Sequence, residues 1–278
     1  MGATDHQERI AGLTPEKRAL LQRRLSSKGV SGGAQTIRRR TESDPSVLSF
    51  TQQQMWFLDQ LQPGTATYNV PFFMRLRGAL NVEALQKAID AVIARHHVLR
   101  TVFAAPQGTP IPVLLKKWQP PLKYADLRSL PEQAREPEAR RLLEQEAARP
   151  FNFARDLMLR TMLVQLANEE FFFLHLSHHV AWDLRSREVL YHELAHNYAA
   201  FNAGRSPSLP ELPIQYEDYA HWQREWLQAE NLEKLVSYWK QQLAGAPPKL
   251  ELPTDRPRPP VQSLRGAKIP ASFPADLA

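Results

Sequence analysis

The chain has 278 residues, of which 43% are hydrophobic, so it can fold as one large domain or two small ones with a substantial core. It contains no cysteine, which excludes disulfides and thiolate chemistry and favours a reducing, cytoplasmic compartment. No apolar run reaches membrane-spanning length, and the net charge of +6 comes without a nucleic-acid-binding motif. We therefore expect neither a membrane nor a nucleic acid as a partner.

Residues 1–45 are predicted to be an N-terminal appendage. A capping threonine followed by proline can begin a short charged helix at 14–25. Residues 26–41 are rich in glycine and serine and include three consecutive arginines, a composition typical of a linker. The helix can dock to another protein, or it can be a loosely attached chain end, and the sequence leaves both open.

From residue 46 onward, hydrophobic periodicity and end signals predict alternating helices and strands. The predicted helices are 49–61, 81–95 with Asn81 as the cap, 136–148, 186–201, 216–229 and 232–243. The predicted strands are 68–76, 99–103, 111–115, 158–166 and 171–177, the last two forming a hairpin through 168–170. A proline-rich connector follows at 247–260, and 268–273 can begin another strand. This mixture predicts an α/β domain.

The stretch from Phe171 to Asp183 carries the strongest chemical signal. Side chains alternate across a strand, so its members divide into two faces. One face holds Phe172, Leu174, Leu176 and His178, and the other holds Phe171, Phe173, His175, Ser177 and His179. His178 is therefore predicted to point toward a core, and His179 toward the strand mouth, where loops often carry chemistry. The alternative is that both histidines are structural.

Two metal-site interpretations are possible but weaker. His192 and His196 with Glu193 match the His-Glu-x-x-His pattern of zinc proteases. A buried stripe is expected through Leu190, Leu194, Tyr198 and Phe201. That stripe would leave both histidines on the solvent face, and no third histidine follows. His175, His179 and Asp183 could also hold a metal, although three ligands on one short segment rarely converge. We predict no bound metal.

A third interpretation is acyl transfer. A neutral imidazole in a cleft can accept a proton from an amine or alcohol nucleophile, or hydrogen-bond to it. The chain has neither a cysteine nor a Gly-x-Ser-x-Gly elbow to form an acyl-enzyme, so transfer would be direct between two bound substrates. In this scheme His179 acts on the nucleophile, and His178 packs in the core. Asp183 holds the turn by pairing with an arginine.

Four stretches together resemble the motifs of condensation domains from nonribosomal peptide synthetases. His-His-Val-Ala-Trp-Asp at 178–183 resembles the family's His-His-x-x-x-Asp-Gly motif. In the family's order, 49–56, 95–103 and 216–222 are similar to three further motifs, and 238–239, 243–247 and 252–257 resemble the passage into the family's second half. The resemblance covers residue 46 to the end.

The resemblance implies one lobe of a two-lobed fold of the chloramphenicol-acetyltransferase type, with a central mixed sheet and flanking helices. Residues 46–210 would form the N-terminal lobe, and 211–278 would lead into a second lobe that is truncated here. The chain would then be a fragment of a longer peptide or hybrid polyketide/peptide synthetase, and inactive alone. The implied partners are donor and acceptor carrier proteins, whose phosphopantetheine arms hold the substrates, and adjacent adenylation and carrier domains. Residues 1–45 could dock to an upstream polypeptide. No cofactor would bind directly.

Site roles also follow from the resemblance. His179 would be catalytic, His178 would belong to the motif, and Asp183 would be mainly structural. Arg100 is preferred over Arg95 as the partner of Asp183.

Two residues depart from the family pattern. Leu184 stands at the motif's glycine position and adds bulk where an acceptor could pass, and His97 replaces the usual glutamate of the second motif. The predicted function is amide-bond formation by the parent domain. The alternative is a non-catalytic module that binds carrier proteins or neighbouring domains.

Overall fold

The computed structural model describes residues 36–119, 121–248, 250–251, 253–257, 260, 272 and 274. The chain divides into two units, Met1–Arg38 and Arg39–Ala278, and all the elements below belong to the second. The predicted helix at 14–25 lies outside the described residues, as does the predicted strand at 268–273 apart from residue 272. In the part that is described, no helix has the length and apolar character needed to cross a membrane.

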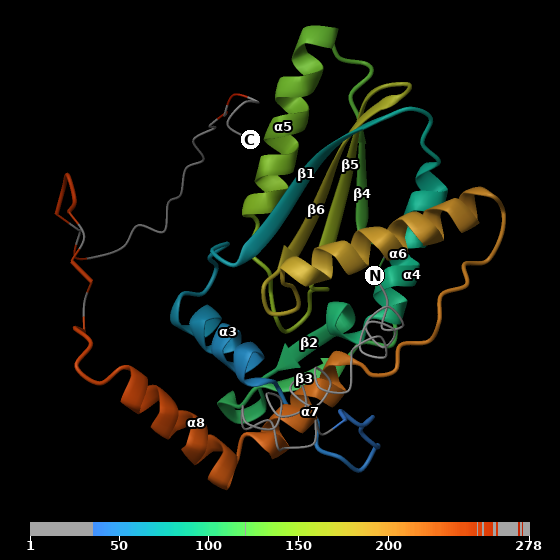
Figure 1. Ribbon diagram of the computed structural model, residues 1–278. Coiled ribbons are helices and arrows are strands. Elements are labelled where there is room, and N and C mark those ends of the chain that lie inside the picture. Colours follow the sequence, from blue (N-terminus) through green and yellow to red (C-terminus); the bar gives the residue numbers. More distant parts are fainter. Residues whose placement is uncertain are drawn as a thin grey trace, which may run out of the picture. The chain divides into compact units, whose positions relative to one another are not determined.

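Each helix and strand predicted between residues 46 and 243 is present, with ends shifted by a few residues (Figure 1). The helices are α3 (Phe50–Leu61), α4 (Val82–Arg95), α5 (Glu132–Ala148), α6 (Leu184–Asn202), α7 (Tyr216–Trp226) and α8 (Ala229–Gln242), with short 3-10 turns at His97–Arg100 and Pro106–Gly108. The strands are β1 (Asn69–Arg77), β2 (Thr101–Ala104), β3 (Ile111–Leu114), β4 (Leu122–Asp126), β5 (Leu159–Ala167) and β6 (Glu170–His178). Strand β4 is short and has several exposed residues, and its sequence pattern does not predict it.

The main sheet has the order β1-β6-β5-β4 and is mixed, as predicted. β6 pairs antiparallel with β1 and β5, whereas β4 runs parallel to β5. β2 and β3 form a separate two-stranded sheet. The predicted hairpin between β5 and β6 is confirmed, with Leu159 opposite Ser177. β6 is therefore an interior strand, which suits its continuous apolar run.

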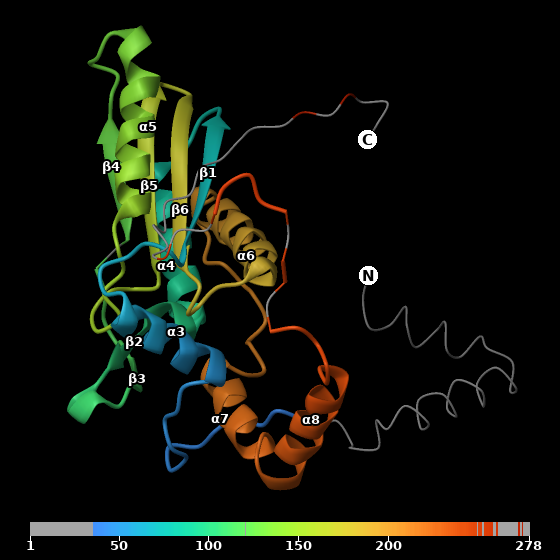
Figure 2. The same ribbon diagram turned by 90° about the vertical axis from the view of Figure 1, so that its left-hand side faces the viewer.

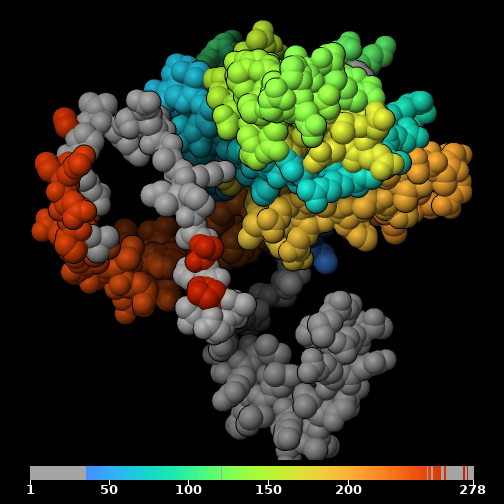
Figure 3. Space-filling view, turned by 90° about the horizontal axis from the view of Figure 1, so that it is seen from above, coloured from blue at the N-terminus to red at the C-terminus, as the bar shows by residue number. Residues whose placement is uncertain are grey.

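Two hydrophobic cores cover the two faces of this sheet. Figure 2 shows α5 on one face of the sheet and α6 on the other, and Figure 3 shows these layers from above. Helix α4 packs against α6 on the same side. One core, which we call the α5 core, contains Leu143, Leu174 and Leu176. The other, the α4/α6 core, contains Val92, Leu190, Phe171 and Phe173. The predicted alternation of β6 is thus confirmed, since its successive side chains enter opposite cores.

The start of α5 differs from its prediction. The helix begins at Glu132 with Pro131 at its N-cap, so Pro137 lies inside it rather than in its first turn. A proline there removes the hydrogen bond that its N–H would give to the carbonyl of Gln133. Gln133 is exposed, so water can satisfy that carbonyl instead.

The buried face of α6 is rotated by about one residue from the predicted stripe. Leu190 is buried as expected, but the next buried residues are Glu193, Asn197 and Ala200. A glutamate is not expected in a buried stripe, but Glu193 is paired: its carboxylate lies 3.0 Å from the Arg95 guanidinium and 2.7 Å from His96 Nε2. His192 and His196 are exposed, as predicted.

Part of the predicted appendage belongs to the second unit. The Arg39 guanidinium donates to the Pro213 carbonyl at 2.8 Å and pairs with Glu211. The backbone N–H of Arg40 donates to the Asp218 carboxylate at 2.9 Å. These contacts tie residues 39–40 to the segment that leads into α7.

Candidate active site

His178, the last residue of β6, is buried among aromatic rings and accepts a backbone hydrogen bond. Its ring packs edge-on against Phe151 and Phe153, at centroid distances of 5.6 and 4.7 Å. The Val180 N–H donates to its Nδ1 at 3.0 Å, so in the neutral ring the proton sits on Nε2. Burial, together with the nearby His179 and Arg160, lowers the pKa of His178 to about 4. This is the environment of a packing residue.

His179 is exposed, and its backbone N–H donates to the Tyr68 carbonyl at 3.1 Å. Its ring Nδ1 lies 3.1 Å from the carbonyl oxygen of Trp182. A carbonyl can only accept, so Nδ1 carries the proton in the neutral ring and Nε2 keeps its lone pair. The exposed ring can therefore take a proton from a nucleophile at Nε2.

The turn after His179 is anchored in both cores. Val180 is buried in the α5 core and Trp182 in the α4/α6 core. Between them, the Ala181 N–H donates to the His178 carbonyl at 3.0 Å. An exposed histidine thus sits on a turn whose neighbours on either side are fixed by packing.

Asp183 caps α6. Its carboxylate accepts the Ser186 N–H at 2.8 Å and the Ser186 hydroxyl at 2.7 Å, and these bonds lower its pKa. In return, the Ser186 hydroxyl oxygen accepts the Asp183 N–H, which completes a capping box. The carboxylate is exposed and satisfied by its own helix end.

The expected pairing of Asp183 with an arginine is therefore wrong. Arg100 donates to the carbonyls of Leu115 and Ala94 and lies over the ring of Trp118. Arg95 pairs with Glu193 at 3.0 Å. A surface carboxylate at a helix N-terminus needs no distant cation, because the first-turn donors already satisfy it.

Leu184 and His97, the two departures from the family pattern, both fit the surrounding structure. Leu184 is the first residue of α6, with 70% of its surface exposed. Among the described residues, the non-glycine positions with positive φ are Gln107 and Ala229, so leucine at 184 brings no backbone strain. His97 has an acidic partner, since its Nδ1 lies 3.1 Å from the Glu217 carboxylate.

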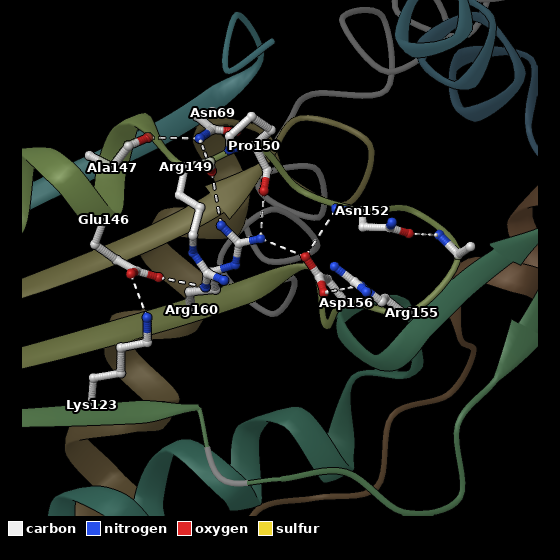
Figure 4. Close-up of polar contacts among 11 residues, drawn as sticks. Asn69, Lys123, Glu146, Ala147, Arg149, Pro150, Asn152, Arg155, Asp156 and Arg160 are labelled. Carbon is white, nitrogen blue, oxygen red and sulfur yellow. Dashed lines mark hydrogen bonds and ion pairs between the residues drawn. The ribbon is translucent and has the colours of Figure 1, made fainter. Parts of the chain in front are cut away.

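Arg160 was missed by sequence analysis, although it stands out as an arginine inside the apolar strand β5. Figure 4 shows its guanidinium donating to the carbonyls of Arg149 (2.9 Å) and Pro150 (2.8 Å) and to the Asp156 carboxylate (2.6 Å). The same group lies 3.9 Å from the ring centre of Phe151. Burial lowers its pKa, while Asp156 opposes that change.

These contacts fix the loop between α5 and β5. The loop carries Phe151 and Phe153, the rings that pack against His178. Arg160 thus supports the position of His178 through the loop that carries these two aromatic rings.

The three candidate metal ligands do not converge on one point. His175 is 1% exposed and bonds to Ser177 and Tyr191. His179 bonds to the Trp182 carbonyl, and Asp183 to Ser186. Within the described ranges, no group of three or more His, Asp or Glu residues is placed to hold a metal ion.

Comparison with known proteins now identifies the family. The family model of the condensation domain matches residues 42–278. The chain is 43% identical over 268 residues to a component of the linear gramicidin synthase of Brevibacillus parabrevis, covering 96% of this chain and 5% of that protein. It is 40% identical over 274 residues to phosphinothricin tripeptide synthetase PhsC of Streptomyces viridochromogenes, covering 98% of this chain and 25% of that protein.

Solved structures agree on the fold. The X-domain from teicoplanin biosynthesis matches with a TM-score of 0.69 and 29% identity, over 80% of this chain and 48% of that one. The starter condensation domain of rhizomide synthetase RzmA matches with a TM-score of 0.65 and 18% identity, over 74% and 49%. The chain thus spans about half of these solved chains and a smaller share of the synthetases. The predicted fold class is confirmed, and the chain belongs to the condensation-domain family.

Proposed function

We propose that this chain forms the N-terminal part of a domain that joins an acyl or peptidyl thioester to the amine of an aminoacyl thioester. The observation that carries the proposal is the hydrogen bond between His179 Nδ1 and the Trp182 carbonyl. It leaves Nε2 unprotonated on an exposed ring at the strand end, where an amine can meet it. Family membership supports the substrate class.

The reaction balances without any further reagent. The acceptor amine attacks the thioester carbonyl, and a C–N bond forms as the proton of the resulting ammonium passes to His179 Nε2. Collapse of the tetrahedral intermediate breaks the C–S bond. The departing donor thiolate then takes the proton from the imidazolium, leaving an amide and a free thiol. No acyl-enzyme is needed, which fits a chain without cysteine.

The remaining parts of the machinery are also proposed. A second lobe would complete the substrate channel, in keeping with the share of the solved chains that this chain spans. Donor and acceptor carrier proteins would deliver their thioesters on phosphopantetheine arms, with adenylation domains loading them. Such an assembly would work in the cytoplasm.

Product formation in the full-length synthetase tests this proposal. Donor and acceptor carriers are loaded, mixed and analysed by intact-protein mass spectrometry. The expected result is an acceptor carrier that gains the donor acyl mass while the donor carrier loses it. Retention of both original masses at all times would contradict the proposal.

A second function, a non-catalytic module that binds other proteins, has two observations in its favour. Leu184 places an exposed leucine beside the histidine turn, at the family's glycine position. The similar X-domain from teicoplanin biosynthesis has been solved in complex with OxyB.

Leu184→Gly separates the two functions. If the leucine obstructs the acceptor, the glycine variant of the full-length synthetase will form product faster than the parent. A lack of product from both proteins would favour the binding module. Leu232→Gly provides a control for loss of an exposed leucine near the start of another helix, α8.

A further inference from the structure

His175 is a buried polar residue that the proposed reaction does not use. It is 1% exposed and lies on the β6 face that the α4/α6 core covers. Both ring nitrogens have partners: Nε2 lies 2.7 Å from the Ser177 hydroxyl and Nδ1 lies 3.2 Å from the Tyr191 hydroxyl. A buried polar group of this kind generally costs more free energy than an aliphatic side chain. We therefore expect His175 to have a role beyond filling space in the core.

Burial keeps the His175 ring uncharged at neutral pH, and it moves the ionisation of Tyr191 further above neutral pH. It lowers the pKa of His175 to about 3 and raises that of Tyr191 to about 12. At neutral pH the row Tyr191–His175–Ser177 is thus a neutral chain of hydrogen bonds. Two bonds on opposite sides of one ring fix the orientation of the ring plane, which an apolar side chain could not do.

The fixed ring packs directly against Trp182. The indole meets the imidazole edge-on, with centroids 4.5 Å apart and planes at 72°. Phe72 closes the group, since it stacks on His175 at 5.6 Å and touches Trp182 at 6.2 Å. The position of the Trp182 side chain therefore depends on the orientation of the His175 ring.

Trp182 links this group to the exposed histidine, because its carbonyl oxygen faces His179 Nδ1 at 3.1 Å. We propose that His175, oriented by Ser177 and Tyr191, positions Trp182 and so holds His179 with Nδ1 protonated and Nε2 free. His175 and Trp182 are positioning residues in this scheme. The inference rests on the proposed function of His179.

Imidazole nitrogen NMR of the 278-residue chain tests the positioning directly. Two-bond 1H–15N correlations distinguish the two neutral tautomers, and the His179 signals are assigned by their loss in His179→Gln. In the parent, we expect His179 to carry its proton on Nδ1. In His175→Leu and in Tyr191→Phe, we expect its signals to shift toward a mixture of tautomers.

Kinetics of the full-length synthetase give the second measurement. Misplacement of a reacting group lowers the chemical step, so kcat should fall about tenfold or more in His175→Leu, with KM for the carriers unchanged. Tyr198→Phe is the matched control: it removes a hydroxyl from the same helix, where it accepts the Asn81 N–H at 3.0 Å, and should change neither measurement.

Three outcomes are decisive. Unchanged His179 signals and unchanged kcat in folded His175→Leu would overturn the positioning role. If His175→Leu does not fold, Tyr191→Phe and Ser177→Ala each remove one hydrogen bond, and the same comparison applies to them. A parent synthetase that makes no amide would remove the proposed function, whereas the NMR comparison would still decide whether His175 orients His179.

Discussion

At the scale of single residues, His178 and His179 hold their protons on opposite ring nitrogens. A backbone N–H points at Nδ1 of His178, whereas a backbone carbonyl points at Nδ1 of His179. The pleat of β6 places the first ring between two phenylalanines and leaves the second exposed. Two identical side chains therefore differ in chemistry because the backbone around each one differs.

Asp183 provides the residue-scale prediction. Asp183→Ala removes the N-cap of α6, so the free energy of unfolding should fall by about 1 kcal/mol. Asp183→Asn keeps an acceptor for the Ser186 N–H and should stay within a few tenths of a kcal/mol of the parent. Urea unfolding of the three proteins measures both values. A loss of about 3–5 kcal/mol in the alanine variant would instead indicate a stranded buried charge.

At the scale of elements, the loop between α5 and β5 depends on one buried cation. Arg160 bonds to two loop carbonyls and to Asp156, and its guanidinium covers the ring of Phe151. The neighbouring Arg155 lies 3.7 Å from the same carboxylate, but 78% of its side chain is exposed. The two arginines therefore form a natural pair for comparison.

Arg160→Met should lower the free energy of unfolding by about 3 kcal/mol or more, because it removes a charged donor from the Asp156 carboxylate and from the carbonyls of Arg149 and Pro150. Arg155→Met should change it by less than about 0.5 kcal/mol, as surface substitutions usually do. Chemical denaturation followed by tryptophan fluorescence measures both. Equal losses in the two variants would contradict the structural role of Arg160.

Sequence alone predicted the elements whose signals are local. The apolar run of β6 and the Asn81 cap with the buried stripe of α4 are examples. It missed β4, because that strand is held by parallel pairing with β5, a non-local contact that its short and partly exposed sequence does not reveal.

In the site, the strand pleat predicted the separation of the two histidines, but the partner of Asp183 was wrong. A local signal existed: Ser186 stands three residues after Asp183, as in a capping box. Arg160 had a signal too, as a lone arginine in an apolar strand. The contact between Trp182 and His175 joins a turn to a strand interior through ring packing, and no spacing rule gives such geometry.

At the scale of the whole second unit, the sheet carries one buried neutral histidine on each face. His178 belongs to the α5 side and His175 to the α4/α6 side. Their pKa values of about 4 and about 3 lie below the ordinary histidine value of 6.5. Both histidines gain protons when the chain unfolds in mildly acidic solution, which couples folding to pH.

Stability should therefore fall as the pH is lowered from 6.5 to about 5, a window above the ordinary carboxyl range. In that window these two histidines bind protons in the unfolded chain but not in the folded chain. Each one therefore changes the free energy of unfolding by up to about 1.4 kcal/mol per pH unit. Urea unfolding at several pH values should give a smaller slope for His175→Leu than for the parent. His192→Leu, which removes an exposed histidine, should keep the parent's slope. Parallel curves for the parent and His175→Leu would contradict this expectation.

The most direct measurement is the single-turnover rate of amide formation by the full-length synthetase with His179→Ala. Rapid quenching and intact-protein mass spectrometry follow transfer of the acyl mass from donor to acceptor carrier, with His192→Ala as the control for loss of an exposed histidine. Because His179 lies at the surface, its variant should unfold at the parent's denaturant midpoint. We predict that His179→Ala lowers the rate by about a hundredfold or more, whereas His192→Ala leaves it unchanged. Transfer by His179→Ala at the parent's rate would contradict a catalytic role for this histidine.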